Sequence, residues 1–274
     1  TTTKPALTHM AWFDGGLVLI GGLALGILLM IAGRFSFAVM QDRSRTELAA
    51  PVSGVASPHL LLAAKTDLFE FRASSIDLQQ GSDLMAAIMK GLPAEVKAFE
   101  QMAQTMDLPP KLIDITYQRL ASAGPVTSLV RTERIVLEDD TSSISYATSL
   151  FNELKPDGIH LRDFFQPGIF SKQSLNTQLC NEIRKQKAIR LGGVQEINCA
   201  RYPKADAFDG APVAFVASNE DNLFGGMRFY FKAGDIGAPA EGMYIITLRQ
   251  SAFREELKPA YRSLFGGTPA QLAS

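Results

Sequence analysis

Near its start the chain carries one uninterrupted apolar segment, Gly15–Gly33, which lies between the charged residues Asp14 and Arg34. A helix rises about 1.5 Å per residue, so a segment of this length can span a hydrocarbon core of about 30 Å. Aromatic rings favour the headgroup region, and the segment has such rings at both ends: Trp12, Phe13, Phe35 and Phe37. The pattern therefore predicts one membrane-spanning helix. A cleaved signal peptide is the alternative, because Ser36-Phe37-Ala38 would serve as a cleavage site.

A stripe of small residues follows this predicted helix. Glycines recur at intervals of seven, four and seven residues, at Gly15, Gly22, Gly26 and Gly33. This spacing places all four on one face of a helix with about 3.6 residues per turn. Small residues let helix backbones approach closely in lipid, so we predict that this face packs against another membrane helix. The alternative is that glycine is simply common in membrane helices.

The hydrophobic and polar positions divide the chain into five regions. These are a short leader (1–14), the membrane helix with its juxtamembrane extension (15–47), a linker rich in proline, alanine and serine (48–58), a helical region (59–124) and an α+β domain (125–274). In the helical region, apolar residues recur at three- and four-residue steps. Ser82 is expected to cap one helix, Pro93 to open a second and Pro109-Pro110 to open a third.

The α+β domain is predicted from a change of period after Gly124-Pro125. We expect a strand or hairpin over 126–138, helices over 141–154 and from Ser171 onward, strands over 212–218, 227–233 and 243–249, and a closing helix over 253–265. Strands grouped in this way between helices predict a mostly antiparallel sheet with flanking helices. The expected fold is thus a single N-terminal transmembrane helix followed by an α+β soluble domain.

The charge balance and the sequence motifs give few indications of a catalytic or binding site. The 27 basic and 28 acidic residues nearly balance, so charge does not favour nucleic acid as a partner. The sequence has no nucleophile elbow, phosphate-binding loop, zinc-protease motif or dinucleotide fingerprint. His160 with Asp157 and Asp163 has a spacing that metal ligands can adopt, but these residues surround a predicted turn. The acidic run Glu138-Asp139-Asp140 is expected at a helix start, where it favours the helix dipole. We therefore predict no catalytic residue, no cofactor and no metal site.

The two cysteines and the charges that flank the apolar segment indicate on which side of the membrane the soluble domain lies. A disulfide between Cys180 and Cys199, the only cysteines, would require an oxidising compartment, whereas two buried thiols would not. Positive charge before and after the apolar segment slightly favours a cytoplasmic domain, with Lys4 on one side and Arg34, Arg43 and Arg45 on the other. A short, weakly charged leader before a large domain is typical of bacterial signal-anchor proteins. We predict an inner-membrane protein with a periplasmic domain.

Together these features predict a non-catalytic, single-pass subunit of a multi-protein complex in the inner membrane. Its glycine face would dock within the lipid bilayer, and its α+β domain would bind other membrane-protein subunits or a second copy. In architecture alone, this layout resembles inner-membrane components of bacterial secretion and pilus machines. The alternative is a membrane-anchored ligand-binding or sensor domain that works through a partner.

Overall fold

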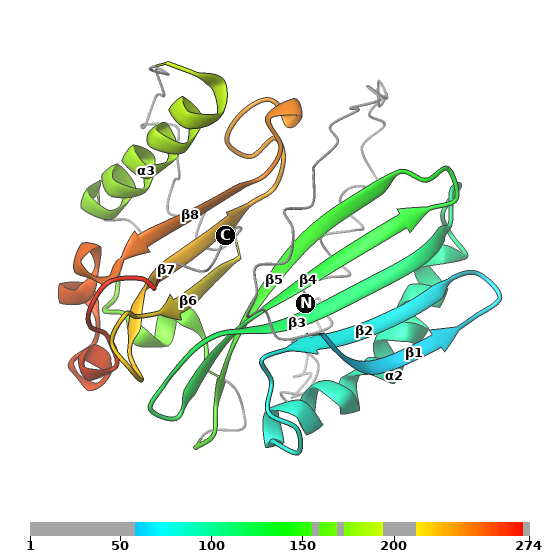
Figure 1. Ribbon diagram of the computed structural model, residues 1–274, viewed down its shortest axis with the longest axis horizontal. Helices are drawn as coiled ribbons and strands as arrows, with labels where there is room; N and C mark the ends of the chain where they lie inside the picture. The colour runs from blue at the N-terminus through cyan, green and yellow to red at the C-terminus, as the bar shows by residue number, and fades with distance from the viewer. Residues whose placement is uncertain (1–57, 155–158, 169–172, 194–211, 271–274) are drawn as a thin grey trace, which may run out of the picture. The chain divides into compact units, whose positions relative to one another are not determined.

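A five-stranded sheet, a three-stranded sheet and two long helices form the part of the chain that the structure describes (Figure 1). The structure is a computed structural model, and it describes residues 58–154, 159–168, 173–193 and 212–270. All of them belong to one compact unit, Arg45–Ser274. The elements are β1 (His59–Lys65), β2 (Glu70–Ile76), α2 (Asp83–Ala103), β3 (Pro110–Ala123), β4 (Val126–Leu137), β5 (Ser142–Asn152), α3 (Gln173–Leu191), β6 (Val213–Ala217), β7 (Phe224–Phe231) and β8 (Tyr244–Arg249). This is an α+β fold, as predicted.

The larger sheet has the strand order β1-β2-β3-β4-β5. Its strands are antiparallel except for β2 and β3, which run parallel. A parallel pair needs a crossover connection, and α2 supplies it. The β3–β4 hairpin turns at Gly124, whose φ of 52° lies in the left-handed region that suits glycine. The sheet is therefore mixed, with a meander of three antiparallel strands at one end.

Helix α2 covers one face of this sheet. Ser82 caps it, because its hydroxyl oxygen accepts a hydrogen bond from the Met85 backbone N–H at 3.2 Å. Leu92 and Phe99 are buried against sheet residues that alternate along β2 and β3, among them Phe71 and Ile113. The helix stripe with a period near 3.6 thus meets a strand face with a period of two. This contact forms the core on that side of the sheet.

The smaller sheet has the order β6-β7-β8 and is antiparallel throughout. Its core is rich in aromatic rings, with Phe215 and Phe265 packed edge to face at a centroid distance of 4.9 Å. Helix α3 adds Leu179 and Ile183 to the same cluster, and β3 adds Ala121. One hydrophobic cluster therefore contains residues from both sheets.

Several predicted elements are confirmed. The strands over 126–138, 212–218, 227–233 and 243–249 correspond to β4, β6, β7 and β8, and the helix predicted after Ser171 corresponds to α3. Ser171 itself lies outside the described residues.

Other predicted elements are wrong. Residues 59–124 are not all helical, because this stretch contains β1, β2 and β3 around a single helix. Pro93 lies inside α2 instead of opening a second helix. In β3, Ile113 and Ile115 are buried on one face with a period of two, and a helical stripe fits the same apolar residues by coincidence. Strand β5 (Ser142–Asn152) takes the place of the helix expected over 141–154, and 3-10 helices such as η7 (Pro259–Leu264) replace the expected closing helix.

The predicted leader, the membrane segment with Gly15, Gly22, Gly26 and Gly33, and the linker up to residue 57 lie outside the described residues. Within the ranges that the structure describes, no helix is long and apolar enough to cross a membrane.

Candidate functional site

The edge strands of the two sheets differ in how their outer backbone groups are protected. An edge strand presents unpaired N–H and C=O groups that can pair with another chain, and proteins usually blunt such edges. In the larger sheet the edge strands are β1 and β5, and in the smaller sheet they are β6 and β8. Three of these four edges carry an identifiable protection.

Strand β1 is short and irregular. Its pairing with β2 shifts register between Leu60 and Leu62, which marks a β-bulge, and the strand ends at the charged residue Lys65. A bulge bends the strand and interrupts the regular row of backbone groups. This edge is a poor template for a further strand.

The edges of the smaller sheet are occupied by other parts of the chain. On β8, the Gln186 side-chain amide of α3 donates a hydrogen bond to the Ile245 carbonyl oxygen at 2.7 Å. On β6, the Ala217 carbonyl oxygen accepts from the Ala270 N–H at 2.8 Å. Helix α3 therefore contacts the edge of β8, and the segment around Ala270 pairs with the end of β6.

Among the residues that the structure describes, none gives strand β5 such a protection along its first half. Its pairing with β4 runs without a register shift, and its 11 residues include no charged residue and no proline. Toward its end, the Thr148 hydroxyl accepts from the Val213 N–H at 3.1 Å, and Leu150 bridges to Ile159. No residue of the described ranges pairs with the outer side of Ser142–Ala147. We call this segment the open edge.

A buried ionic network supports the sheet next to the open edge. Arg131 and Glu133 on β4 lie opposite Ala147 and Ser145 of β5. The Arg131 Nη2 atom lies 2.9 Å from Glu133 Oε2 and 3.1 Å from Oε2 of Glu95, which reaches in from α2. Burial raises the pKa of the Glu133 carboxyl, although the Arg131 charge opposes this shift. The network ties α2 to β4.

Tyr117 completes the network from β3. Its hydroxyl donates to Glu95 Oε1 at 3.1 Å, and burial together with the Glu95 charge raises the pKa of the phenol. Burial acts to lower the pKa of Arg131, but the carboxylates of Glu133 and Glu95 outweigh it, so that the guanidinium pKa is raised. Through these contacts the network joins β3, β4 and α2.

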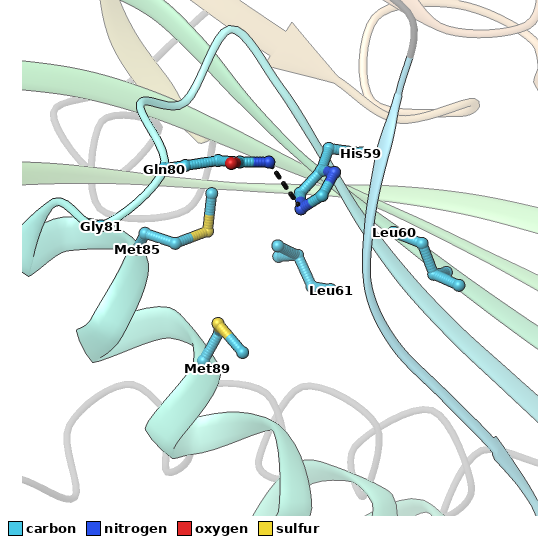
Figure 2. Close-up of a pocket in the computed structure, with 7 residues that line it drawn as sticks. All are labelled: His59, Leu60, Leu61, Gln80, Gly81, Met85 and Met89. Atoms are coloured by element: carbon cyan, nitrogen blue, oxygen red, sulfur yellow. Dashed lines mark hydrogen bonds between the residues drawn. The ribbon is translucent and has the colours of Figure 1, made fainter.

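A cleft of about 410 Å³ lies between β1 and the N-terminal half of α2 (Figure 2). Its lining residues are His59, Leu60, Leu61, Gln80, Gly81, Met85 and Met89. The His59 Nε2 atom lies 3.2 Å from the Gln80 side-chain nitrogen, and this pair is the hydrogen bond drawn across the cleft. Most of the remaining lining is thioether or aliphatic, so the cleft suits an apolar or soft ligand.

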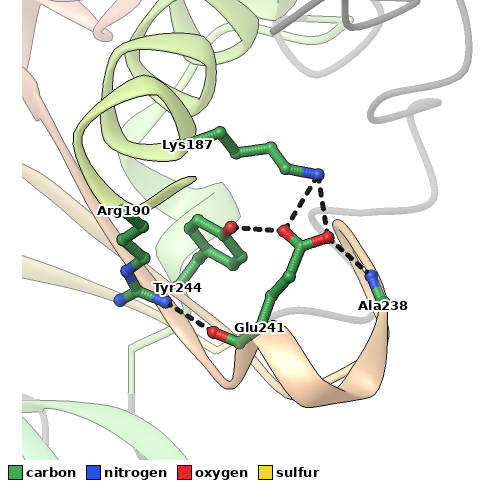
Figure 3. Close-up of polar contacts among 5 residues, drawn as sticks. All are labelled: Lys187, Arg190, Ala238, Glu241 and Tyr244. Carbon is green, nitrogen blue, oxygen red and sulfur yellow. Dashed lines mark hydrogen bonds and ion pairs between the residues drawn. The ribbon is translucent and has the colours of Figure 1, made fainter. Parts of the chain in front are cut away.

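A second polar cluster fastens α3 to the loop before β8 (Figure 3). Glu241 accepts from the Tyr244 hydroxyl at 2.6 Å and from the Ala238 N–H at 2.9 Å, and its Oε2 atom lies 3.0 Å from Lys187 Nζ. These hydrogen bonds, that of Tyr244 first, lower the pKa of Glu241 to about 2. Burial and the neighbouring carboxylate raise the pKa of Tyr244 to about 12.

Arg190 closes this cluster. Its guanidinium lies 4.2 Å from the centroid of the Tyr244 ring, and its Nη1 atom donates to the Glu241 carbonyl oxygen at 3.1 Å. Every charged group of the cluster is thus partnered within the fold. The arrangement acts as a clamp that holds α3 over the edge of β8.

The cysteine prediction falls partly outside the described residues. Cys180 on α3 is fully buried and disulfide-bonded. Its predicted partner, Cys199, lies outside the described ranges.

The other polar groups considered from the sequence have structural partners. The His160 N–H donates to Asp163 Oδ2 at 2.8 Å, at the start of the 3-10 helix η1 (Leu161–Phe164), and Asp157 lies outside the described residues. Asp139 lies in the β4–β5 turn, where it accepts from Thr141, instead of at a helix start. Among the described residues no group of three histidine, cysteine or acidic side chains is arranged to hold a metal ion.

Sequence reasoning missed the open edge because it assigned residues 141–154 to a helix. Ile144, Thr148 and Phe151 have helical spacing, and this spacing determined the assignment. The signal that pointed to a strand was composition: Ile144, Tyr146, Thr148 and Phe151 belong to residue types that favour strands over helices.

Comparison with known proteins identifies no family. No family model matches the chain, and no curated protein matches its sequence. Among solved structures, a member of the DUF3298 family from Bacteroides fragilis has a TM-score of 0.47 and 10% identity, over 76% of this chain and 95% of that chain. A DUF3298 family protein from Pseudomonas aeruginosa has a TM-score of 0.44 and 14% identity, over 78% and 95%. Likenesses of this size do not assign the chain a function.

Proposed function

We propose that this protein is a non-catalytic binding subunit of a membrane complex, and that its α+β domain accepts an extended segment of a partner along the open edge. One observation carries the proposal: Ser142–Ala147 is regular and uncharged and pairs with no described residue on its outer side, whereas the other three edges are bulged or contacted by other segments. Proteins that expose an edge in this way often use it for strand addition, in which main-chain hydrogen bonds supply the affinity.

The side chains of the open edge indicate the chemistry of the added strand. Ile144 is 49% exposed and lies on the same face as Tyr146, whose ring stacks on Tyr230 at a centroid distance of 4.8 Å. Ser143 and Ser145 occupy the opposite face. Because the edge carries no charge, a partner strand with apolar residues beside Ile144 and small polar residues on its other face fits best.

The predicted membrane helix would anchor this domain at the inner membrane. Its glycine face would bind other membrane subunits or a second copy, within the lipid bilayer of the inner membrane. The disulfide bond of Cys180 supports an oxidising compartment, and with it the periplasmic side. A bacterial secretion-type or comparable assembly would combine such an anchor with a docking domain.

A lysine at the open edge tests strand addition. In the full chain, purified from cross-linked membranes, Ile144→Lys should reduce the co-purified partner subunits about tenfold, because a charge on an edge strand opposes further pairing. The matched control is Ala63→Lys, which places the same side chain at an exposed position of the other edge strand, β1. Co-purified proteins are quantified by mass spectrometry, and the thermal melting temperature checks folding.

Equal partner recovery from both variants would refute strand addition at β5. Loss of self-association in Ile144→Lys, with no other protein affected, would identify the partner strand as a second copy of the chain.

A second candidate function is a membrane-anchored ligand-binding or sensor domain that works through a partner. The observation that favours it is the cleft between β1 and α2, which is open to solvent and lined mostly by apolar side chains. A ligand that binds the folded protein raises its melting temperature, so a thermal-shift screen of small molecules and metal ions tests this function.

A further inference from the structure

We propose that the cleft between β1 and α2 is a binding site for a soft monovalent metal ion of the Cu(I) type, held by the thioether sulfurs of Met85 and Met89 and the imidazole of His59. The inference rests on the second candidate function and names its ligand class. The proposed metal site includes no residue of the open edge, so it can be tested independently of strand addition at β5.

The two methionines are placed as a pair. They are four residues apart on α2, which brings them to the same helix face one turn apart. Figure 2 shows both side chains projecting from α2 into the cleft, toward β1. Met85 is 4% exposed and Met89 is 48% exposed, so one sulfur lies at the base of the site and the other at its mouth.

Core packing does not account for Met89. Methionine often fills gaps in hydrophobic cores, and on α2 that role belongs to Leu92 and Phe99, which are almost fully buried against the sheet. A half-exposed thioether beside a cleft contributes little to packing. Its position suits contact with something that enters from solvent.

His59 faces the methionines from the first position of β1. The Gln80 side-chain nitrogen can only donate a hydrogen bond, so the His59 Nε2 atom accepts it at 3.2 Å and its lone pair points across the cleft at Gln80. An arriving metal ion would replace the Gln80 N–H at this lone pair.

The donor set selects the metal. Thioether and imidazole ligands suit Cu(I), whereas Mg²⁺ and Ca²⁺ require oxygen ligands. The seven lining residues include no carboxylate, and Leu60 and Leu61 make the rest of the wall apolar. Gly81 leaves space at the entrance, because a Cβ atom there would meet no atom within 4 Å. The cleft thus offers two soft sulfurs, one nitrogen and an entry path.

Competition with a coloured chelator tests the proposal. The full chain, with its disulfide intact, is titrated with Cu(I) under ascorbate and without oxygen, in the presence of bicinchoninate. We expect one Cu(I) per chain. The double variant Met85→Leu/Met89→Leu should bind at least about tenfold more weakly, since losing even outer contacts of a metal site costs about this factor. Leucine preserves the side-chain volume.

The matched control is Met102→Leu, the same substitution on the same helix, at a partly buried methionine that packs against the core cluster between α2 and the sheet. It should bind Cu(I) like the unaltered chain. His59→Ala should weaken binding while leaving sulfur scattering in the X-ray absorption spectrum of the bound copper.

Two outcomes would overturn the proposal. One is an unaltered chain that cannot compete with bicinchoninate, and the other is a double variant that retains full affinity, which would place the copper elsewhere. In either case partner recovery in the Ile144→Lys experiment is unaffected, so failure of the metal site is distinguishable from failure of strand addition.

Discussion

Strands β5 and β8 are both edge strands, but they differ in how far other described residues cover their outer backbone groups. The β8 edge is covered by α3, whose Gln186 amide occupies a backbone carbonyl oxygen of the strand and whose Lys187 is clamped by Glu241. Within the described ranges nothing pairs with the β5 edge along Ser142–Ala147, and the buried Arg131–Glu133 ion pair lies on the neighbouring strand, β4. The other three edges are protected by a bulge, by a helix and by the segment around Ala270. An unprotected edge strand tends to pair with other chains, so we infer that the β5 edge is normally occupied by a partner. The contrast is what makes β5 the candidate docking edge.

The largest effect is expected from the network beside the open edge. Arg131→Ala leaves the Glu133 and Glu95 carboxylates without their cation in a buried site, and breaking such a pair costs about 3–5 kcal/mol. Urea unfolding followed by circular dichroism measures this loss. As a control near the other edge, Arg72→Ala removes an exposed ion pair with Glu70 and should cost less than about 1 kcal/mol. Similar costs for the two variants would mean that the network does not stiffen this side of the sheet.

Weakening the contact between α3 and β8 is expected to lower the free energy of unfolding less, and to increase self-association of the chain measurably. Gln186→Ala removes the hydrogen bond to the Ile245 carbonyl oxygen, at a cost of about 1 kcal/mol. It also leaves one backbone acceptor of this edge without its partner, which should increase self-association at high concentration in analytical ultracentrifugation. Gln178, an exposed glutamine on the same helix, provides the control variant Gln178→Ala. An unchanged monomer fraction in Gln186→Ala would show that α3 covers β8 without this hydrogen bond.

The smallest effect is expected from acid, acting on the clamp over β8. The pKa of Glu241 is lowered from 4.5 to about 2 in the folded protein, so the folded state holds its proton more weakly than the unfolded state does. Its stabilisation is therefore fully present above about pH 4.5 and is lost as the pH falls toward 2. Melting temperatures between pH 5 and pH 2 should fall more for the unaltered chain than for Glu241→Gln. Parallel curves for the two proteins would exclude a contribution from this clamp.

The sequence predicted those elements whose pattern is local. The Ser82 cap and the apolar stripe of α2 follow from residues three and four apart, and the strands β6, β7 and β8 follow from short apolar runs rich in valine, isoleucine and phenylalanine. Both the cap and the runs need no knowledge of distant contacts.

What could not be predicted depends on which strands become neighbours. The apolar spacing of Ile144, Thr148 and Phe151 fits a helix as well as a strand, and only pairing with β4 decides between them. Strand β5 comes last in the strand order, so Ser142–Ala147 has no neighbouring strand among the described residues on its outer side. No single segment of the sequence determines this order. In the same way His59 and Met85 lie 26 positions apart in the sequence, and they meet because β1, β2 and α2 fold back on one another. The candidate sites are therefore products of topology.

The parallel pairing of β2 with β3 has a consequence for the order of folding. The meander β3–β4–β5 is connected by short turns and closes through local contacts, whereas β2 can join β3 only after the crossover through α2 is in place. Contacts that close longer loops form later. We therefore expect the meander to be the nucleus, and β1, β2 and α2 to consolidate last. Amide protons of β1 should then exchange with solvent faster than those of β4, and a metal ion in the cleft should slow exchange in β1.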